Sequence, residues 1–416
     1  MGEFPASWLL LPVSEVVRNV TLTDKKIPQK RYLPSGKFPV FDQGQEYVGG
    51  YTDDAAMVVD CDLPVIVFGD HTRVVKLVNT AFAPGADGVK VLQPSACILP
   101  KLLEHFVRYL VTKIPNNGYA RHYQHLARSL LPIPPLAEQH RIVAKIEELF
   151  SELDQGVASL KKAREQLKVY RQSLLKNAFE GKLTAAWRAA HRDQLETAAA
   201  LQQRIARERQ ARYQQQLADW ETAGQAGPKP KPPKHLPPLT AEELAELPEL
   251  PAGWAWIRLG ATNVAVFDGP FGSNLKSSDY VSDGVRVIRL ENIGAMEFIE
   301  DKLSFITPEK YQALEKHTVF PGDLVFSSFV TENVRVAMVP PSVEKAVNKA
   351  DCFCIRLFGE SLLNSFALNF LATRSVYKRL EEEIHGVGRP RINTTQLKNV
   401  AIPVCSTDEQ RELVAL

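Results

Sequence analysis

The longest regular pattern in the sequence is LAEQHRIVAKIEELFSELDQGVASLKKAREQLKVYRQSLLKNAFE, which occupies residues 136–180. Large aliphatic residues return in it every seven positions, at Ile146, Leu153, Leu160, Leu167 and Leu174. A seven-residue repeat is typical of a helix that packs lengthwise against a partner helix. The stretch therefore predicts a coiled-coil-like helix on the order of 65 Å long, at about 1.5 Å per residue.

Two further segments follow this helix. Gly181-Lys182 ends it, and residues 184–222, rich in Ala, Arg and Gln, predict a second helix. Residues 156–216 hold 13 Lys and Arg against 5 Asp and Glu, an excess that the formal charge of +2 for the whole chain hides. Residues 227–238 contain six prolines and three lysines. This composition predicts a polyproline-like tether that keeps the second half at a distance.

The chain repeats itself on either side of these helices. Pro5-Ala6-Ser7-Trp8 recurs 246 residues later as Pro251-Ala252-Gly253-Trp254, and Glu138-Gln139 recurs 271 residues later as Glu409-Gln410. The second copy is therefore 25 residues longer inside. Short β-branched runs and turns between the markers predict strands. We expect an α+β fold in which two repeated domains are joined by long coiled-coil-like helices.

The composition shifts place the expected boundaries. They are a first domain at 1–135, spacer helices at 136–226, a Pro- and Lys-rich linker at 227–250, a second domain at 251–405 and the start of a second spacer helix at 406–416. That last helix stops early compared with the first, as if the chain were cut or naturally short. No long apolar segment is present, so we expect a cytoplasmic protein without a membrane contact. The five cysteines predict reduced core thiols.

The sequence contains no recognisable catalytic motif. It lacks a phosphate-binding loop, a dinucleotide-binding glycine pattern, the zinc-protease motif and the tetrad of amino-methyltransferases. The histidines form no ligand set, and His122 and His125 are expected to be an exposed pair. We therefore predict no catalytic residue, no metal site and no cofactor in this chain.

Polar, glycine-rich turns in both copies carry side chains that bind base edges and phosphates. Arginines are expected to contact DNA, the amide, hydroxyl and imidazole groups to add polar contacts, and the aromatic rings to anchor loops. In the first copy the candidates are Gln43, Tyr47, His71, Arg73, Arg121 and Tyr123. In the second copy they are Phe271, Asn274, Lys276, Ser328, Asn333, Arg335, Arg389 and Arg391.

Several stretches of the sequence resemble stretches of the specificity subunits of type I restriction-modification enzymes. The similar stretches are Leu131-Pro132-Ile133-Pro134-Pro135-Leu136-Ala137-Glu138-Gln139, Phe179-Glu180-Gly181-Lys182-Leu183-Thr184 with Trp187-Arg188, Pro251-Ala252-Gly253-Trp254, Asp268 to Ser278 and Val287 to Ile293. The resemblance covers nearly the whole chain. It implies two target recognition domains that bind both halves of a split duplex DNA sequence.

The resemblance also implies partners. Methyltransferase and restriction subunits would dock on the chain, and S-adenosylmethionine, ATP and Mg²⁺ would belong to those subunits. The heptad residues are the expected docking seam, because aliphatic side chains on an isolated helix stay in water. The seam could instead be covered by a second copy of the chain, or by residues 184–222 folding back with Trp187, Leu201 and Ile205. A different reading of the whole pattern is a coiled-coil adaptor that binds proteins rather than DNA.

Overall fold

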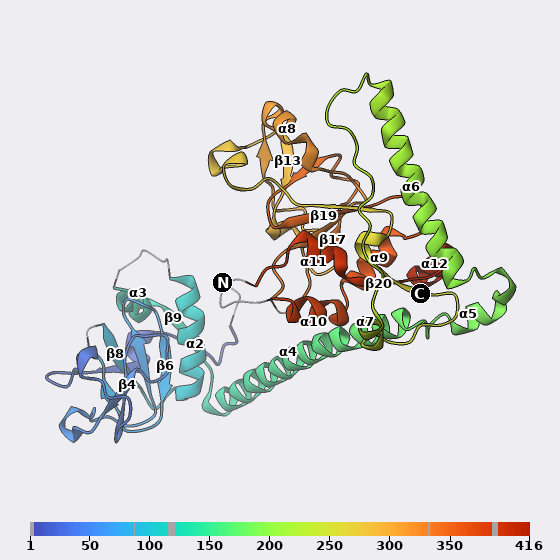
Figure 1. The fold of residues 1–416 in the computed structure, drawn as a ribbon. Coiled ribbons are helices and arrows are strands. Elements are labelled where there is room, and N and C mark those ends of the chain that lie inside the picture. Colours follow the sequence, from blue (N-terminus) through green and yellow to red (C-terminus); the bar gives the residue numbers. More distant parts are fainter. Residues whose placement is uncertain (1–3, 87, 115–120, 332, 385–389) are drawn as a thin grey trace. The chain divides into compact units, whose positions relative to one another are not determined.

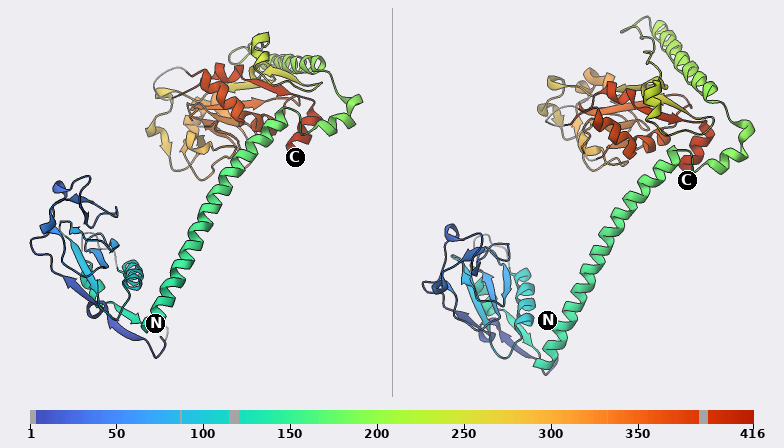
Figure 2. Two further views of the ribbon diagram at one scale, coloured as in Figure 1. Left: turned by 90° about the horizontal axis from the view of Figure 1, so that it is seen from below. Right: turned by 60° about the horizontal axis from the view of Figure 1, so that its bottom comes forward.

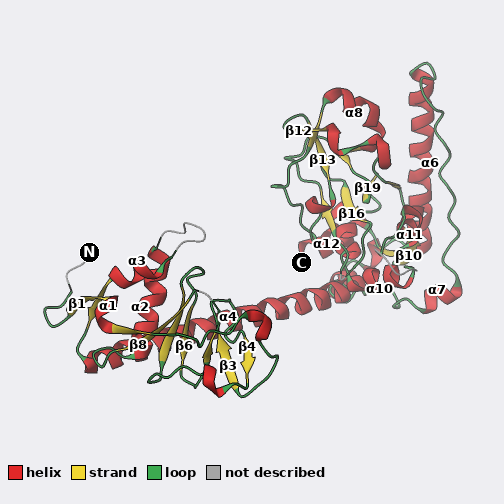
Figure 3. Ribbon diagram, turned by 90° about the vertical axis from the view of Figure 1, so that its left-hand side faces the viewer, coloured by secondary structure: helices red, strands yellow, loops and turns green. Residues whose placement is uncertain are grey.

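The computed structural model describes residues 4–86, 88–114, 121–331, 333–384 and 390–416 (Figure 1). The chain forms two compact units, Met1–Lys162 and Ala163–Leu416. The division falls inside the long helix, so each unit contains one of the two expected domains and a part of that helix. Helices and strands are mixed within each unit (Figure 3), so the α+β class predicted from the sequence is confirmed.

The first unit is built on an antiparallel sheet with the strand order β2-β8-β5-β6. In that order the strands are Val17–Val20, Val89–Pro94, Val65–Gly69 and Val75–Val78. Every residue of β5 is buried. Because alternate residues of a strand point to opposite faces, Ile66 and Phe68 join one core cluster while Val65 and Val67 join another. The sheet is therefore covered on both faces.

The remaining elements of the first unit pack around this sheet. Helix α2 (Pro100–Lys113) adds Leu103 and Val107 to the cluster of Ile66 and Phe68. A smaller sheet has the order β4-β3-β7, in which β3 and β7 are parallel. The further elements are α1 (Val13–Val16), α3 (Tyr123–Arg128), β1 (Leu9–Pro12), β3 (Phe38–Phe41), β4 (Gly50–Thr52), β7 (Ala83–Pro84) and β9 (Leu130–Ile133). Strands β1 and β9 pair, which joins the two ends of the domain.

The second unit has a main sheet with the order β11-β19-β16-β17, again antiparallel throughout. Its second sheet has the order β12-β14-β13-β18-β15, in which β13 and β18 are parallel, and β10 pairs with β20. The strands are β10 (Ala255–Arg258), β11 (Val264–Phe267), β12 (Tyr280–Val281), β13 (Val285–Ile288), β14 (Phe305–Ile306), β15 (Thr318–Val319), β16 (Leu324–Ser327), β17 (Val336–Met338), β18 (Ala346–Asn348), β19 (Cys352–Leu357) and β20 (Ala401–Val404).

The two units have the same topology. Strands β2, β8, β5 and β6 correspond in order and direction to β11, β19, β16 and β17, and β4-β3-β7 corresponds to β14-β13-β18. The second copy adds β12 and β15 at the two edges of the smaller sheet, with helix α8 (Pro308–Leu314) before β15. These additions contribute to the greater length of the second copy. The repeat seen in short sequence markers is thus a repeat of the whole domain.

Helix α4 (Leu136–Phe179) has nearly the predicted bounds. It begins just after Pro134-Pro135 and ends where Gly181 adopts a left-handed conformation with φ of 68°. There the N–H of Gly181 donates to the carbonyl of Ala178 at 2.9 Å, and the N–H of Lys182 donates to that of Asn177 at 2.9 Å. Glycine tolerates this φ without strain, which explains the stop.

The segment after α4 differs from the single helix expected over 184–222. It forms α5 (Ala185–Ala190), a short 3₁₀ turn and then α6 (Ala198–Thr222). The hydroxyl of Thr197 accepts a hydrogen bond from the N–H of Ala200 at 3.2 Å, so a new helix starts there. Leu201 and Ile205 are buried in the core of the second unit. The fold-back of this segment onto the α4 seam is therefore wrong.

The proline-rich linker is also not a free tether. Figure 2 shows it running beside α6 and the body of the second unit. Arg209 of α6 donates to the carbonyl of Lys234 at 3.2 Å, and Arg258 of β10 donates to that of Pro237 at 3.0 Å. Arg258 also pairs with Glu243 of α7 (Ala241–Ala245) at 2.7 Å. The linker contacts the second unit instead of holding it at a distance.

Candidate nucleic-acid interface

Three polar segments of the first unit meet at the turn between β5 and β6. The main-chain carbonyl of Asp70 accepts from the N–H of His122 at 2.9 Å, and its carboxylate accepts from the N–H of Tyr123 at 2.7 Å. The carbonyl of Gln43 accepts from the hydroxyl of Thr72 at 2.7 Å. The segments that contain Gln43, His71 and Tyr123 are thus neighbours, although they lie far apart in the sequence.

The second unit repeats this arrangement at the turn between β16 and β17. The carbonyl of Ser328 accepts from the N–H of Ile392 at 2.9 Å, just as that of Asp70 accepts from His122. The N–H of Ser328 donates to the carbonyl of Asp351 at 2.9 Å, and the N–H of Asp70 donates to that of Gly88 at 2.6 Å. Gly88 and Asp351 both have a left-handed φ, of 81° and 71°. Equivalent loops therefore gather in both copies.

The candidate side chains of the first unit divide into anchors and exposed groups. Tyr47 donates its hydroxyl to the carbonyl of Leu77 at 2.5 Å, and Arg73 donates to that of Ile114 at 3.0 Å. Tyr123 is half-buried, and burial, followed by the charge of Asp70, raises its pKa. Arg121 is exposed. Of these residues, Arg121 is placed best for direct contact with a ligand.

Two polar side chains of the loops are more buried than expected. The imidazole of His122 is buried, and its Nδ1 lies 2.9 Å from the carbonyl of Asp70, so His122 and His125 are not the exposed pair predicted. Gln43 accepts from the N–H of His71 at 3.4 Å through its side-chain oxygen. Both contacts hold the loops together.

The second-unit candidates divide in the same way. Ser328 is 1% exposed and donates its hydroxyl to Asp351 at 2.9 Å, so this side chain is not at the surface, contrary to the expectation of a DNA contact. Arg335 donates to the carbonyl of Leu290 at 3.1 Å and to the hydroxyl of Ser327 at 2.9 Å, which ties two loops. Arg391 is half-exposed, lies over the Phe329 ring and is 3.5 Å from Asp351.

The other second-unit candidates are at the surface. Phe271 is 58% exposed, and Asn274, Lys276 and Asn333 are exposed. Arg389 lies outside the described residues. An exposed phenylalanine beside amide and ammonium groups suits a ligand with both a flat ring and a charge.

Sequence reasoning missed three basic residues near these loops. Lys90 lies over the ring of Tyr123 with its Nζ 5.6 Å from the ring centroid. Arg289 and Lys349 both lie beside the ring of Tyr280, at 5.6 and 5.3 Å. Arg289 belongs to the Val287 to Ile293 stretch that carries the resemblance, and this stretch is the sequence signal that marks Arg289 as a candidate. Nothing in the sequence marks Lys349, because β18 and the loop after it are brought here only by the parallel pairing with β13.

Asp268 has an unusual environment at the base of the second-unit loops. Its carboxylate accepts from the N–H of Gly269 at 2.7 Å and of Asp351 at 3.0 Å. Burial, the largest cause, raises its pKa from 3.8 to about 6, and the charge of Asp351 acts in the same direction. The main-chain donors oppose that rise. The loop base is thus sensitive to mildly acidic pH.

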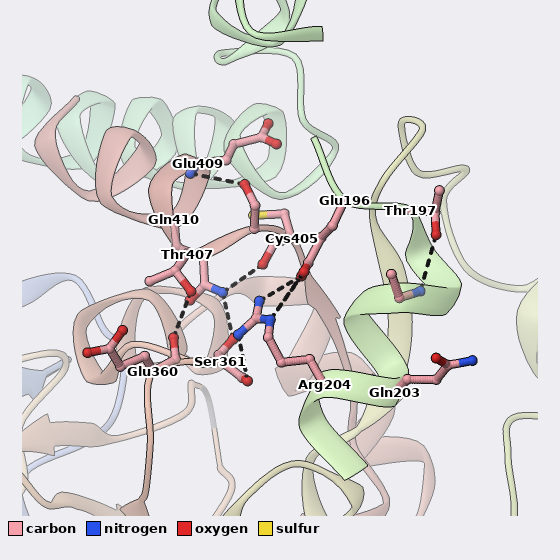
Figure 4. Close-up of polar contacts among 12 residues, drawn as sticks. Glu196, Thr197, Gln203, Arg204, Glu360, Ser361, Cys405, Thr407, Glu409 and Gln410 are labelled. Atoms are coloured by element: carbon pink, nitrogen blue, oxygen red, sulfur yellow. Dashed lines mark hydrogen bonds and ion pairs between the residues drawn. The ribbon is translucent and has the colours of Figure 1, made fainter. Parts of the chain in front are cut away.

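A glutamine side chain closes each domain at the start of the helix that follows it. Gln139 accepts from the N–H of Leu99 at 2.8 Å and donates to the carbonyls of Cys97 and Pro134. Gln410 accepts from the N–H of Leu363 at 2.9 Å and donates to two carbonyls, those of Ser361 and Cys405, as Figure 4 shows. These equivalent clamps explain why Glu-Gln marks both copies.

The expected docking seam on α4 is bare over most of its length. Leu153 is 60% exposed, Leu160 73%, Leu167 66% and Leu174 36%, whereas Ile146 is half-buried. The first three side chains thus form an exposed apolar row along the helix.

The described residues contain no group of three or more His, Cys, Asp or Glu side chains placed to hold a metal ion. All five cysteines are free thiols. Cys352, Cys354 and Cys405 are buried, whereas Cys61 is half-buried and Cys97 exposed, so the expected core position holds for three. Among the described helices, none combines the length and apolar character needed to cross a membrane.

Comparison with known proteins supports the sequence resemblance. Residues 274–415 match the type I restriction modification DNA specificity domain. The chain is 39% identical over 217 residues to the type I restriction enzyme EcoKI specificity subunit of Escherichia coli K12, covering 45% of this chain and 46% of that protein. It is 25% identical over 324 residues to the EcoAI specificity subunit of E. coli, covering 68% and 52%. The chain thus spans about half the length of these relatives.

The fold is also found in solved structures. The HsdS subunit from Thermoanaerobacter tengcongensis is similar with a TM-score of 0.51 and 20% identity, covering 100% of this chain and 89% of that one. A second similar chain comes from a structure that describes the complex assembly and conformational transition of the type I R-M system. Its TM-score is 0.53 and its identity 17%, and the match covers 100% of this chain and 90% of that one. The specificity-domain match over residues 274–415, the partial matches to curated subunits and the shared fold make the chain similar to type I restriction-modification specificity subunits.

Proposed function

We propose that this chain recognises a bipartite sequence in double-stranded DNA, with one half-site bound by each domain. The observation that carries the proposal is the repeated loop arrangement, in which Asp70 accepts from His122 and Ser328 accepts from Ile392. Two copies of one binding surface suit two similar half-sites. Arg121 and Arg391 are the side chains best placed for contact, with Phe271, Asn274 and Lys276 beside the second surface.

Partner subunits are the second part of the proposal. Methyltransferase subunits would pack on the exposed α4 residues Leu153, Leu160 and Leu167, because each large aliphatic residue that leaves water contributes roughly 1.5 to 3 kcal/mol. Restriction subunits would join the complex. The EcoKI and EcoAI relatives are named as specificity subunits of restriction enzymes, which supports a role inside a larger assembly. We propose that this assembly is cytoplasmic.

We propose that the chain itself has no catalytic role. Its sequence has no motif for methyl transfer or strand cleavage, so S-adenosylmethionine, ATP and Mg²⁺ would be bound by the partner subunits. Purified chain that methylated or cut DNA without a partner would contradict this part.

Fluorescence anisotropy with labelled duplex DNA tests the proposal. We expect affinity to fall steeply with salt, because phosphate contacts release counterions. The alternative, a coiled-coil adaptor for proteins, predicts no binding to any duplex or binding that is insensitive to salt. The assay should use the full chain with and without a methyltransferase subunit, since the bare seam makes the isolated chain prone to association.

A further inference from the structure

A cavity of about 300 Å³ lies between α6, the proline-rich linker and β11 in the second unit. None of the candidate DNA-contact residues of the proposed function lines it. Its basic lining residues are Arg209, Arg212, Lys231, Lys234 and Lys398. Among the described residues that line it there is no Asp or Glu. The cavity therefore combines a concentrated positive charge with no acidic group in its own wall.

The positive groups are held by neutral acceptors. Arg209 donates to the carbonyls of Lys234 and Gly260 at 3.2 and 3.4 Å. Arg212 donates to the side-chain oxygen of the buried Asn263 at 3.2 Å, and its guanidinium lies 3.6 Å from the centroid of the Phe358 ring. These contacts fix the guanidinium groups in place but leave their charge uncompensated.

Ordinary ion pairing is absent here, while it is present close by on the same helix. Arg204 pairs with Glu196 at 2.7 Å and donates to the hydroxyl of Ser361 at 2.8 Å, as Figure 4 shows. In the part of the chain that the structure describes, none of the five cavity cations forms an ion pair with a carboxylate. On α6, Arg204 is thus compensated by a carboxylate, whereas the cavity arginines Arg209 and Arg212 are not.

The surroundings of the cations disfavour their charged forms. Burial lowers the pKa of Arg209, and burial followed by the charges of Arg209 and Arg356 lowers that of Arg212. Burial and the nearby charge of Lys234 lower the pKa of Lys398. An anion in the cavity would reverse these shifts, because opposite charge stabilises the protonated groups.

The rest of the wall indicates the kind of anion. Tyr213 and Phe267 bring aromatic rings, and Gln216 and Asn263 bring amide groups. Aromatic rings stack on nucleobases, whereas Arg and Lys bind phosphate oxygens. We propose that this cavity is a phosphate-binding site for a ligand of nucleotide chemistry, either a free nucleotide or the backbone of a polynucleotide.

Titration of the full-length chain with sodium pyrophosphate and with ADP, at constant ionic strength, tests for a free phosphate ligand. The variant is the double substitution Lys231→Gln with Lys234→Gln, because both side chains are exposed on the linker and their loss should not disturb the fold. Arg212→Gln is the second variant. We expect the double variant to weaken binding at least tenfold, since it removes two cations that would make charge-assisted contacts to phosphate oxygens.

The backbone arm of the test uses a duplex without a target sequence. If the ligand is a polynucleotide, pyrophosphate and ADP do not bind, and the double variant lowers the slope of log affinity against log salt by about 0.9 per lost phosphate contact. Lys229→Gln is the matched control, because Lys229 belongs to the same linker but lies over Trp220 outside the cavity.

The proposal is overturned if neither free probe binds and the salt slope is unchanged in the double variant. It is equally overturned if Lys229→Gln causes the same loss. Sequence-specific binding by the recognition loops is a separate property. A double variant that loses the phosphate ligand but selects the same DNA sequence would separate this site from the proposed function.

Discussion

The indole N–H of Trp254 donates a hydrogen bond to the carboxylate of Glu409 at 2.9 Å, across 155 residues of sequence. Trp8 donates to Glu138 at 3.1 Å in the first unit. The two markers by which the repeat is recognised in the sequence are therefore in direct contact in both copies. Each contact fastens the start of a domain to the first turn of the helix that leaves it.

The two glutamates differ in their other partners. Glu409 is 1% exposed and also accepts from the hydroxyl of Thr184 at 2.6 Å and from Arg188. These residues follow α4, so the Gly-Lys-Leu-Thr and Trp-Arg stretches seen in the sequence are fixed on the second domain. Glu138 is only half-buried, and no described residue of this chain makes the equivalent contacts.

We predict that Glu409→Gln destabilises the second unit by roughly 3 to 5 kcal/mol, because it leaves the charge of Arg188 without its buried partner. Hydrogen exchange should show faster exchange of the β20 and α12 (Thr407–Ala415) amides. Asp408→Asn, on the same helix but 76% exposed, is the control and should change little. Equal effects of the two substitutions would show that the buried cluster does not stabilise the unit.

A second prediction concerns pH. The folded chain holds the proton of Asp268 up to about pH 6, whereas the ordinary pKa is 3.8. The stability that this group contributes is therefore fully present below about pH 3.8 and is lost as the pH rises through 6. Asp268→Asn keeps an acceptor for Gly269 and Asp351 but cannot ionise. Urea midpoints measured from pH 4 to 7 should show a wild-type decline that the variant lacks, and parallel curves would contradict the raised pKa.

The third prediction addresses the second-domain loops. Arg391→Ala should weaken DNA binding by about 1 to 3 kcal/mol and relax one position if it reads guanine, or weaken all sequences alike if it binds phosphate. Arg335→Ala should also weaken binding, because Arg335 ties Leu290 to Ser327. Arg411→Ala, an exposed residue outside the loops, is the control for binding assays. Unchanged binding by both loop variants would remove this surface from the proposal.

The fourth prediction concerns α4. Replacing Leu153, Leu160 and Leu167 with Glu should abolish co-purification with the methyltransferase subunit. The glutamate carboxylates would have to be buried without a partner in the interface, which is unfavourable. Circular dichroism should show that both domains stay folded. Gln155→Glu with Lys162→Glu, about half a helical turn away from the seam, serves as the control. Normal assembly of the triple variant would show that the subunit docks elsewhere.

The sequence predicted the elements that depend on local patterns. The seven-residue spacing predicted helix α4, and Gly181 predicted where it ends, to within one residue of the observed C-terminus. The repeat markers gave two domains because Trp254 and Glu409 are constrained by a shared contact. The break at Thr197 was missed, since Ala-rich sequence is compatible with an unbroken helix. The Thr197 hydroxyl caps the start of α6, and the burial of Leu201 and Ile205 holds the helix on the second unit.

The candidate site was harder to predict from sequence. The polarity of the loops correctly identified segments that meet in space. It did not distinguish the exposed Arg121 from Ser328, whose hydroxyl donates to the carboxylate of Asp351. Likewise Lys349 reaches the loops only through the pairing of β13 with β18. Such contacts depend on tertiary structure and leave no local pattern in the sequence.

The measurement that tests the central claim most directly is selection from random duplex DNA with the complete chain assembled with its methyltransferase subunit. The account predicts two short conserved blocks at a fixed separation of about one helical turn, 34 to 36 Å, so that both face the same side of the duplex. Arg391→Ala should change one block and leave the other intact. Enrichment of a single continuous motif, or of no motif, would contradict recognition by two repeated domains.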